Sequence, residues 1–534
     1  MTTVPDVSVV VAVYNTMPYL TECMTSLVEQ SIGRERLEII AVDDGSTDAS
    51  GKELERFAEL YPGTIKVIHQ SNSGGPARPS NRALELATGR YVYFVGSDDH
   101  LGAEALERLV TAADTYDSDV VVGKMVGVNG RYVHQALFKS TNTDVKLDDS
   151  ALPWSLSNCK LFRRELVERH GLRFRESMPI CSDQPFTIEA CVRARRISVL
   201  ADYEYYYAVR RTDSSNITFR TAFLTHLRAA EELIEFTVGL IEPGPERDAI
   251  LRRHFTWELA KLLEKDFPDL DRGEQEELCA GIGRMVDQHL TQAVLDKLDA
   301  KRRVRLSLAQ RGAVDALCAV IRQDVEGVIP PIVLDGGRAY LRYPAFGDER
   351  LSLPNDCFEI IVGLGRRMAE GLRTSQARWE SGDDGESVLA VTIRTALLGI
   401  DELDPAAVRV GLTPQPRTVN DDRPILLPVD EVLRQTAEDG SGTDLQARIT
   451  VGQLLARQTG SAKYSVRLYI EAGGTTHDIP VPAAEPIAQL RQWHRARPYR
   501  VSLIAKDRGR LVIAIAPIRP FRVVRLRLQR LVNR

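Results

Sequence analysis

The chain has 534 residues, more than one hydrophobic core usually organises, so two or three domains are expected. Hydrophobic residues make up 43% and charged residues 27%, proportions of an ordinary globular protein that exclude global disorder. The net charge of -5 gives no reason to expect a nucleic-acid partner.

The cysteines and the N-terminus indicate a cytoplasmic protein. Seven cysteines without a C-x-x-C pair are unlike a disulfide framework or a zinc cluster, which favours a reduced, cytosolic setting. Residues 1–6 lack the basic and apolar regions of a secretory signal, and no run of about 18 apolar residues occurs. We expect a soluble chain that at most touches the inner face of a membrane.

Short β-branched strands alternate with helical segments in the first part of the chain, which predicts a βαβ sheet. Crossovers of this kind are almost always right-handed, so we expect the carboxyl ends of the strands to gather at one edge. The predicted strands are Val7–Val13, Leu37–Val42, Ile65–His69, Tyr91–Val95 and Asp119–Gly123, and the predicted helices are Tyr19–Gln30, Lys52–Leu60, Ser80–Ala87 and Ala103–Ala113.

The composition changes twice after this α/β region. From about Thr221 to Ile329, apolar residues recur every three or four positions and predict a helical linker, which Pro330 and Pro331 end. Alternating runs beyond it predict an antiparallel β-sandwich region of one or two modules. These runs are Val388–Thr395, Val408–Leu412, Ala447–Val451, Tyr464–Ile470 and Tyr499–Ile504. The predicted domains are 1–220, 221–330 and 331–534.

Polar clusters follow three of the predicted strands. They are Tyr14 and Asn15, then the turn Asp43–Asp48, and then Gly96–Asp99. An open α/β sheet binds its ligands outside the carboxyl ends of its strands, so the sequence predicts a binding site there.

Asp98 and Asp99 are candidate metal ligands. Two adjacent carboxylates after a buried strand can hold Mg²⁺ or Mn²⁺, which bridges readily to a diphosphate and neutralises charge on a departing phosphate. The alternative is that both residues cap a helix that begins near Gly102.

Asn72–Asn81 is a glycine-rich loop that opens into a helix. Such loops bring backbone N–H groups to a phosphate, and Arg78 would add positive charge. The loop matches neither G-x-x-x-x-G-K-[ST] nor G-x-G-x-x-G, so the sequence does not indicate ATP or NAD. A plain turn with Ser80 as helix cap explains the same residues.

In their order and spacing these motifs resemble the inverting family 2 glycosyltransferases with the GT-A fold, over about the first 220 residues. The resemblance implies transfer of a sugar from a nucleotide diphosphate donor, usually a UDP-sugar. Ala12, Tyr14 and Asp44 correspond to residues that hold the uracil and ribose, and Asp98 to a metal ligand. The expected donor-binding set also includes Asn15, Asn72, Gly74, Arg78 and Ser97.

The chain departs from the family pattern at two positions in these motifs. Gly96 stands where the family commonly has Asp, so a ribose or metal contact is either missing or supplied by Asp99. Ser80 stands where the family often has Arg before Asn81, which leaves the role of Arg78 open.

A third polar cluster, Ile180–Phe186, offers a base. An inverting transfer needs a carboxylate that takes the proton from the acceptor hydroxyl. Asp183 stands where the family places this base, in a pair commonly written Glu-Asp, with Ser182 replacing the glutamate. The alternative from the residues alone is that Asp183 caps a helix with Pro185 near its first turn.

Tyrosines in Asp202–Tyr207 predict a strand, and basic and hydroxyl residues follow it. This second group reads either as a solvated turn or as a segment that closes over a diphosphate, because Arg pairs bidentately with phosphate oxygens. The resemblance favours closure, since tyrosines followed by Arg and Ser are typical of transferases that decorate wall polymers. The residues concerned are Arg210, Arg211, Ser214 and Ser215.

The whole layout is similar to that of the poly(ribitol-phosphate) N-acetylglucosaminyltransferases of wall teichoic acid, whose C-terminal β modules assemble trimers. This similarity implies an anionic cell-wall polymer as acceptor, a UDP-sugar of GlcNAc or another hexose as donor, and a homo-oligomer. Two alternatives stay open, a capsular or lipid-linked oligosaccharide as acceptor, and an inactive polymer-binding scaffold.

The tail Arg519–Arg534 mixes arginine with apolar residues. Such a segment can lie on the anionic inner membrane surface or contact a polyanionic acceptor. A final element with solvated arginines is the alternative.

Overall fold

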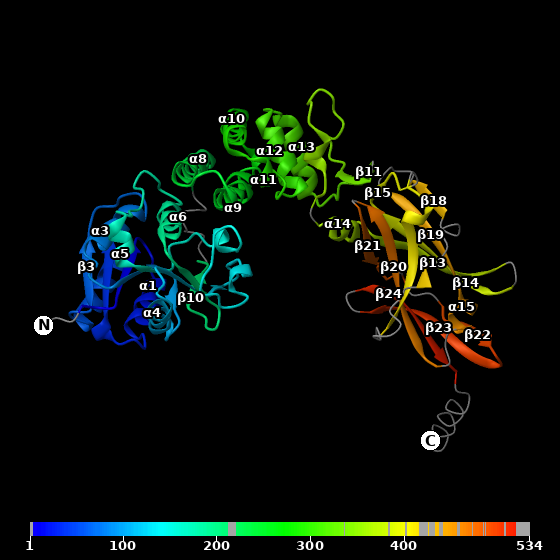
Figure 1. Cartoon of the computed structure of the whole chain (residues 1–534), viewed down its shortest axis with the longest axis horizontal. Coiled ribbons are helices and arrows are strands. Elements are labelled where there is room, and N and C mark those ends of the chain that lie inside the picture. Colours follow the sequence, from blue (N-terminus) through cyan, green and yellow to red (C-terminus); the bar gives the residue numbers. More distant parts are fainter. Residues whose placement is uncertain are drawn as a thin grey trace, which may run out of the picture. The chain divides into compact units, whose positions relative to one another are not determined.

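The chain forms two compact units, Met1–Leu298 and Asp299–Arg534 (Figure 1). Among the described helices, none has the length and hydropathy of a transmembrane segment. All seven cysteines are free thiols. The computed structural model describes residues 4–211, 221–335, 337–361, 363–382, 385–400, 403–415, 425–426, 433–436, 442–456, 460–472, 474–483, 485, 488–506 and 509–518.

A seven-stranded mixed sheet organises the first unit, in the order β3-β2-β1-β4-β8-β6-β9. The first four strands run parallel, and β8 pairs antiparallel with both β4 and β6. Since β1 lies between β2 and β4, the strand order reverses there, which opens a crevice beyond the carboxyl ends of these strands. The strands are β1 (Val7–Val13), β2 (Leu37–Asp43), β3 (Ile65–His69), β4 (Tyr91–Gly96), β6 (Val120–Gly123), β8 (Leu161–Arg163) and β9 (Ile197–Leu200).

Helices cover both faces of this sheet, because its buried strands present apolar side chains alternately to the two sides. Val9 and Val11 belong to the core beneath α1 (Tyr19–Val28), α2 (Ser50–Leu60) and α4 (Ala105–Tyr116). Val10 belongs to the opposite core, with Phe94 and with α3 (Ala77–Glu85), α5 (Arg164–Arg169) and α6 (Asp183–Arg193). The expected α/β sheet is confirmed.

Three helix starts differ from the sequence prediction, and α2 begins at Ser50 instead of Lys52. Helix α3 begins at Ala77 and not at Ser80, because Pro79 lies in its first turn, where a missing N–H breaks no helical hydrogen bond. Ser80 therefore does not cap this helix. Helix α4 begins at Ala105 after Glu104, which also excludes capping by Asp98 or Asp99.

A small sheet and a group of helices complete the first unit. The tyrosine strand β10 (Tyr206–Val209) lies between β5 (His100–Leu101) and β7 (Met125–Val128). The predicted helical region begins with α8 (Phe223–Leu240) and α9 (Pro245–Arg253), followed by a π-helix at His254–Leu259 and by α10 (Arg272–His289) and α11 (Gln292–Leu295).

The second unit is mainly antiparallel β structure, as predicted. It starts with α12 (Ala300–Gln310), α13 (Val314–Val325) and a small sheet of β11 (Ile332–Asp335), β12 (Arg338–Leu341) and β15 (Leu397–Leu398). One larger sheet contains β13 (Arg373–Ser381), β14 (Ser387–Thr395), β18 (Leu433–Thr436) and β19 (Thr443–Thr450). The other contains β16 (Val408–Gln415), β17 (Ile425–Leu426), β20 (Ala462–Ala472), β21 (Thr475–Pro480), β22 (Leu490–His494), β23 (Arg497–Lys506) and β24 (Arg510–Pro517).

Two short helices accompany these sheets, α14 (Leu364–Glu370) and α15 (Val451–Ala456). Val451, which was expected to end a strand, instead begins α15.

Candidate functional site

A cavity of about 450 Å³ lies at the carboxyl ends of the central strands. The register of the sheet produces it, since Val13 pairs with Asp43 and Ala12 with Gly96. The residues that follow these strands therefore meet around one space. The lining residues are Ala12, Val13, Tyr14, Asp44, Asn72, Gly74, Gly75, Pro76, Pro79, Gly96, Ser97, Asp98 and Arg211.

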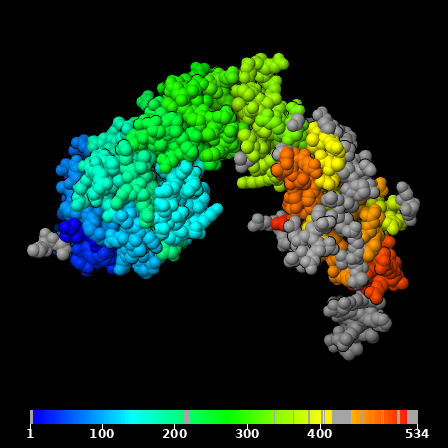
Figure 2. Space-filling model, in the orientation of Figure 1, coloured from blue at the N-terminus to red at the C-terminus, as the bar shows by residue number. Residues whose placement is uncertain are grey.

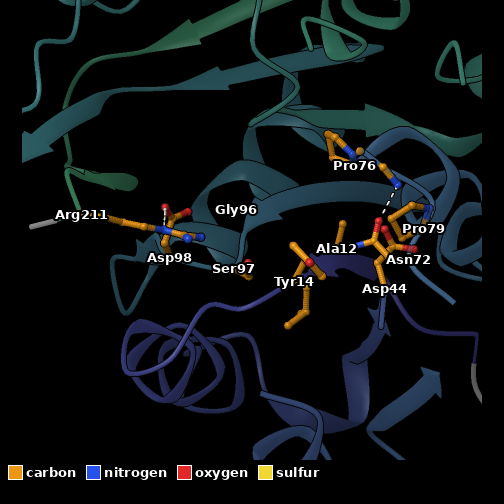
Figure 3. A pocket seen from close by; sticks show the side chains of 13 residues that line it. Ala12, Tyr14, Asp44, Asn72, Pro76, Pro79, Gly96, Ser97, Asp98 and Arg211 are labelled. Atoms are coloured by element: carbon orange, nitrogen blue, oxygen red, sulfur yellow. Dashed lines mark hydrogen bonds and ion pairs between the residues drawn. The ribbon is translucent and has the colours of Figure 1, made fainter. Parts of the chain in front are cut away.

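Asp44 is fixed at one end of this cavity (Figure 3). Its carboxylate accepts hydrogen bonds from Gln70 Nε2 at 2.6 Å, from the Ser73 N–H at 3.0 Å and from Ser73 Oγ at 2.9 Å. Its own N–H donates to the Val13 carbonyl at 2.8 Å. Asp44 thereby ties the glycine-rich loop to the end of β1.

Asp98 and Arg211 occupy the other end, as Figure 3 shows. Arg211 Nε donates to Asp98 Oδ2 at 2.7 Å, and both side chains are mostly buried, at 13% and 15% exposed. Another nitrogen of Arg211 donates to the Asn15 carbonyl at 3.3 Å. The segment after β10 thus brings a guanidinium to the ends of β1 and β4.

Asp99 serves the fold of this region and does not line the cavity. It accepts hydrogen bonds from the Tyr206 hydroxyl at 2.5 Å and from the Val209 N–H at 2.7 Å. Burial, reinforced by the charge of Asp98, raises its pKa, although both hydrogen bonds act in the opposite direction.

The packing around Asp99 explains Gly96. A Cβ atom at this position would lie 2.7 Å from Asp99 Oδ2 and 3.3 Å from the Tyr206 hydroxyl. A side chain at position 96 therefore has no room beside this buried carboxylate.

The cavity fits a divalent cation that binds together with a diphosphate. No cluster of three or more His, Cys, Asp or Glu side chains with metal-binding geometry occurs within the described ranges. Mg²⁺ is commonly held by one or two carboxylates plus substrate phosphates and water, so Asp98 suffices as the anchoring ligand.

Asp183 lies in an adjoining cavity of about 250 Å³. Ala12, Pro76 and Gly96 line both cavities, so the candidate base and the candidate metal ligand border one continuous crevice. Asp183 is the first residue of α6, and Ser182 occupies the N-cap position, so Asp183 is not the capping residue of this helix.

The surroundings of Asp183 suit a base. Burial raises the pKa of its carboxyl group, while its own N–H, the buried charge of Lys160, the N–H of Asn158 and the charge of Arg253 act against this rise. The net pKa is raised, which brings a carboxylate closer to the pH at which general bases work best.

Lys160 is a functional candidate that the sequence prediction missed. Its side chain is completely buried, and Nζ donates to the Ser157 carbonyl at 2.5 Å. Among the described residues, no carboxylate oxygen lies within 4.0 Å of this ammonium group, although the charge of Lys160 acts on Asp183. A lysine beside a short strand carries no sequence signal for such burial.

Glu258, in the π-helix, was also missed. Its carboxylate accepts from Arg253 at 2.5 Å and from Gln184 Nε2 at 3.0 Å. Burial would raise the pKa of Glu258, but Arg253, His254 and Gln184 lower it to about 2. Gln184 follows Asp183 directly, so its hydrogen bond to Glu258 joins the helical region to the start of α6.

A third cavity, of about 570 Å³, is lined mainly by the helical region, and Cys181 lines both this cavity and the one that contains Asp183. Its wall carries charges of both signs, from Arg253, Lys261 and Lys265 and from Glu258, Glu264 and Asp266.

Five predicted donor-binding residues do not line the cavity or fall outside the described residues. The Asn15 side chain orders the acidic turn by accepting from the N–H groups of Thr47 at 2.8 Å and Asp48 at 3.2 Å. Arg78 and Arg210 are exposed and do not line the cavity. Ser214 and Ser215 fall outside the described residues, as does the tail Arg519–Arg534. Ser97 does line the cavity, and its hydroxyl hydrogen-bonds with Thr16 Oγ1 at 2.9 Å.

Two family models match the chain. Residues 8–171 match "Glycosyl transferase family 2", and residues 221–321 match "Glycosyl transferase TarS linker domain".

Among curated proteins, the chain is similar to a "Poly(ribitol-phosphate) beta-glucosyltransferase" of Bacillus spizizenii. The two are 32% identical over 360 residues, which cover 66% of this chain and 56% of the relative. The chain thus spans little more than half the length of this relative.

Solved structures of Staphylococcus aureus TarS are also similar. The TarS 1-349 structure is 30% identical, with a TM-score of 0.53, and the match covers 64% of this chain and 97% of that one. The same fragment has been solved in complex with UDP-GlcNAc. A longer TarS structure matches in fold over 97% of this chain and 86% of that one, with a TM-score of 0.60 at 24% identity.

Proposed function

Because the chain belongs to glycosyltransferase family 2, we propose that it transfers a sugar from a UDP-sugar to a hydroxyl group of a phosphate-rich cell-wall polymer, with inversion at the anomeric carbon. The observation that carries this proposal is the common border of the two cavities at Ala12, Pro76 and Gly96, which brings Asp44, Asp98 and Asp183 to one crevice.

The donor occupies the larger cavity in this proposal. Ala12, Tyr14 and Asp44 hold the uridine, and the Gly74 loop lies against it. Asp98 holds Mn²⁺ or Mg²⁺, and when bound such a cation supplies positive charge to the departing diphosphate. Arg211 adds a second positive charge at the same end, where guanidinium groups pair well with phosphate oxygens.

Asp183 accepts the proton of the acceptor hydroxyl. As it loses this proton, the hydroxyl oxygen of the acceptor forms a bond to the anomeric carbon on the face opposite the diphosphate. The bond from this carbon to the diphosphate oxygen breaks. Asp183 ends the step protonated, and UDP leaves with the electron pair of the broken bond. The configuration at the anomeric carbon is inverted.

The acceptor is a poly(ribitol phosphate) chain, and the sugar is GlcNAc or another hexose. Two relatives support this choice, since one is named for poly(ribitol phosphate) and the other has been solved with UDP-GlcNAc.

Several wider features belong to the same proposal. The enzyme acts in the cytoplasm, with peripheral membrane contact, and assembles as a homo-oligomer such as a trimer. The domain division at residues 220 and 330 also stays a prediction. A capsular or lipid-linked acceptor is the second candidate, and the same chemistry serves it.

The test is release of UDP from a panel of UDP-sugars, with and without purified poly(ribitol phosphate). We expect acceptor-dependent release with Mn²⁺ present, and loss of at least about a thousandfold in kcat for Asp183→Asn with UDP binding retained. Glu189→Gln on the same helix is the matched control and should keep full activity. A wild-type protein that binds polymer but never releases UDP is a scaffold and overturns the proposal.

A further inference from the structure

The hairpin of β22 and β23 belongs to the second unit (Figure 1), and its orange-red atoms reach the surface in the space-filling view (Figure 2). Its register sets Arg491 opposite Arg500 and Trp493 opposite Pro498. These four side chains share one face, because cross-strand partners point to the same side and alternate residues do so too. Trp493 is 68% exposed, whereas Tyr499 on the other face is buried.

No carboxylate of the described residues pairs with the positive charges on the exposed face of this hairpin. Residues 490–500 include four arginines and a histidine but neither Asp nor Glu. Like charges directly opposite one another destabilise a sheet, and none of the described carboxylates lies within 4.0 Å of Arg491 or Arg500. Other arginines of the unit are paired, as Arg378 is with Glu380 and Arg409 with Glu471. Two exposed arginines directly opposite one another offer a place for a ligand of opposite charge.

Charge excludes two occupants that the chain itself could supply. The N–H of Ile518, the last described residue before the tail Arg519–Arg534, donates to the Pro498 carbonyl at 2.8 Å. That sequence has six arginines and no Asp or Glu, the same sign as the hairpin. A second copy that presents the same hairpin face is repelled for the same reason.

The side chains favour a phosphodiester polymer over a bilayer. Arg guanidinium groups match phosphate oxygens in geometry, and an indole ring offers a flat apolar surface to the C–H face of a polyol. Membrane docking draws on several apolar side chains, but Trp493 is the sole large apolar residue that is strongly exposed among the residues seen between 373 and 518.

We propose that this face, made of Arg491, Trp493, Pro498 and Arg500, is a docking surface for the anionic phosphodiester chain of the acceptor polymer, distinct from the cavities of the first unit. The inference rests on the proposed function for the identity of the polymer. A chain held at this face and at the first unit gains effective concentration at the reaction site, so long polymers benefit and short oligomers do not.

The test compares two double variants of the full-length protein that change net charge equally. Arg491→Glu with Arg500→Glu alters the face, and Arg350→Glu with Arg366→Glu alters exposed arginines outside it, at 88% and 86% exposed. We expect the first pair to raise KM for long poly(ribitol phosphate) at least about tenfold and to leave kcat, KM for a short oligomer and UDP-sugar affinity unchanged. The second pair should alter none of these. Trp493→Ala should also raise KM for the long polymer, but by less than the first pair.

Three results overturn the inference. Equal effects of both double variants would mean that only net charge matters. If the Arg491→Glu, Arg500→Glu variant loses binding to phosphatidylglycerol vesicles but still binds polymer, the face contacts a membrane. If its sedimentation coefficient changes, the face is a subunit contact. If the wild type transfers no sugar, the proposed function fails, and direct binding of poly(ribitol phosphate) to the same variants still decides whether the face exists.

Discussion

Arg211 pairs with Asp98, 113 residues earlier in the chain, with Nε 2.7 Å from Oδ2. In the proposed function, a donor diphosphate and its cation share this pair, since the phosphates attract the guanidinium and the cation attracts the carboxylate. The ion pair would then hold both charges in position, each neutralised by the other, before the donor binds.

Arg211→Gln is expected to weaken UDP-sugar binding roughly tenfold or more, because it removes a charge-assisted contact and leaves the Asp98 charge to repel the diphosphate. Isothermal titration with UDP in the presence of Mn²⁺ measures the loss. Arg210→Gln changes an exposed neighbour outside the cavity and should cost much less. Equal losses would mean that Arg211 has no special place in donor binding.

Substitutions of Asp98 and of Asp99 are expected to have different effects. Asp98→Ala should abolish the gain in UDP affinity that Mn²⁺ gives to the wild type, because it removes the anchoring carboxylate. Asp99→Asn should retain that gain but lower the melting temperature, because the buried bonds to Tyr206 and Val209 are weakened. Thermal shift with and without Mn²⁺ measures both effects. A Mn²⁺ response lost only in Asp99→Asn would reverse the assignment.

Lys160→Met should move the acid limb of the pH dependence of kcat/KM to higher pH. The base works only when Asp183 is ionised, and removal of a positive charge raises the pKa of Asp183 further. The other charged or titratable groups that face it, Arg253, Cys159 and Cys181, stay in place.

Methionine keeps the buried volume of Lys160, and UDP binding serves as the control because it does not involve Asp183. An unchanged acid limb would mean that Lys160 contributes only to packing and that its charge does not affect Asp183.

Residues that end strands could be predicted from the sequence, and residues placed by packing could not. The valine run Val7–Val13 specifies a strand directly, and polar residues after such strands, Asp44 and Asp98 among them, follow from sheet topology. Lys160 and Glu258 acquire their importance only through burial against elements distant in the chain. Periodicity and turn signals contain no information about such contacts.

Helix boundaries show the same limit on a smaller scale. Ser80 resembles a cap by its type, but the chain had already entered α3 at Ala77, since Pro79 is tolerated in a first turn. The role of Gly96 was likewise open, and it became clear only from the space that Asp99 and Tyr206 leave.

Glu258→Ala should destabilise the first unit by on the order of 3 kcal/mol, because it leaves the Arg253 guanidinium, 11% exposed, without its buried partner. Burial opposes ionisation of Glu258, but Arg253 and the hydrogen bonds from His254 and Gln184 lower its pKa to about 2.

A lowered carboxyl pKa contributes stability above the ordinary pKa of glutamate, and this contribution is lost as pH falls toward about 2. The difference in melting temperature between wild type and Glu258→Ala should therefore narrow in acid. A constant difference from neutral to acidic pH would mean that the destabilisation comes from lost packing and not from the charge.

Gly96→Asp, which introduces the residue that the family commonly carries, should destabilise this chain by about 2 kcal/mol and weaken donor binding. The new Cβ meets Asp99 Oδ2 at 2.7 Å, and a third carboxylate beside Asp98 and Asp99 adds repulsion where the diphosphate must bind. Gly239→Asp is the matched control, because nothing lies within 4 Å of a Cβ there. Melting temperature and UDP titration measure the two effects, and a Gly96→Asp protein as stable as the control would show that Asp99 can move aside and that the family contact is available to this chain.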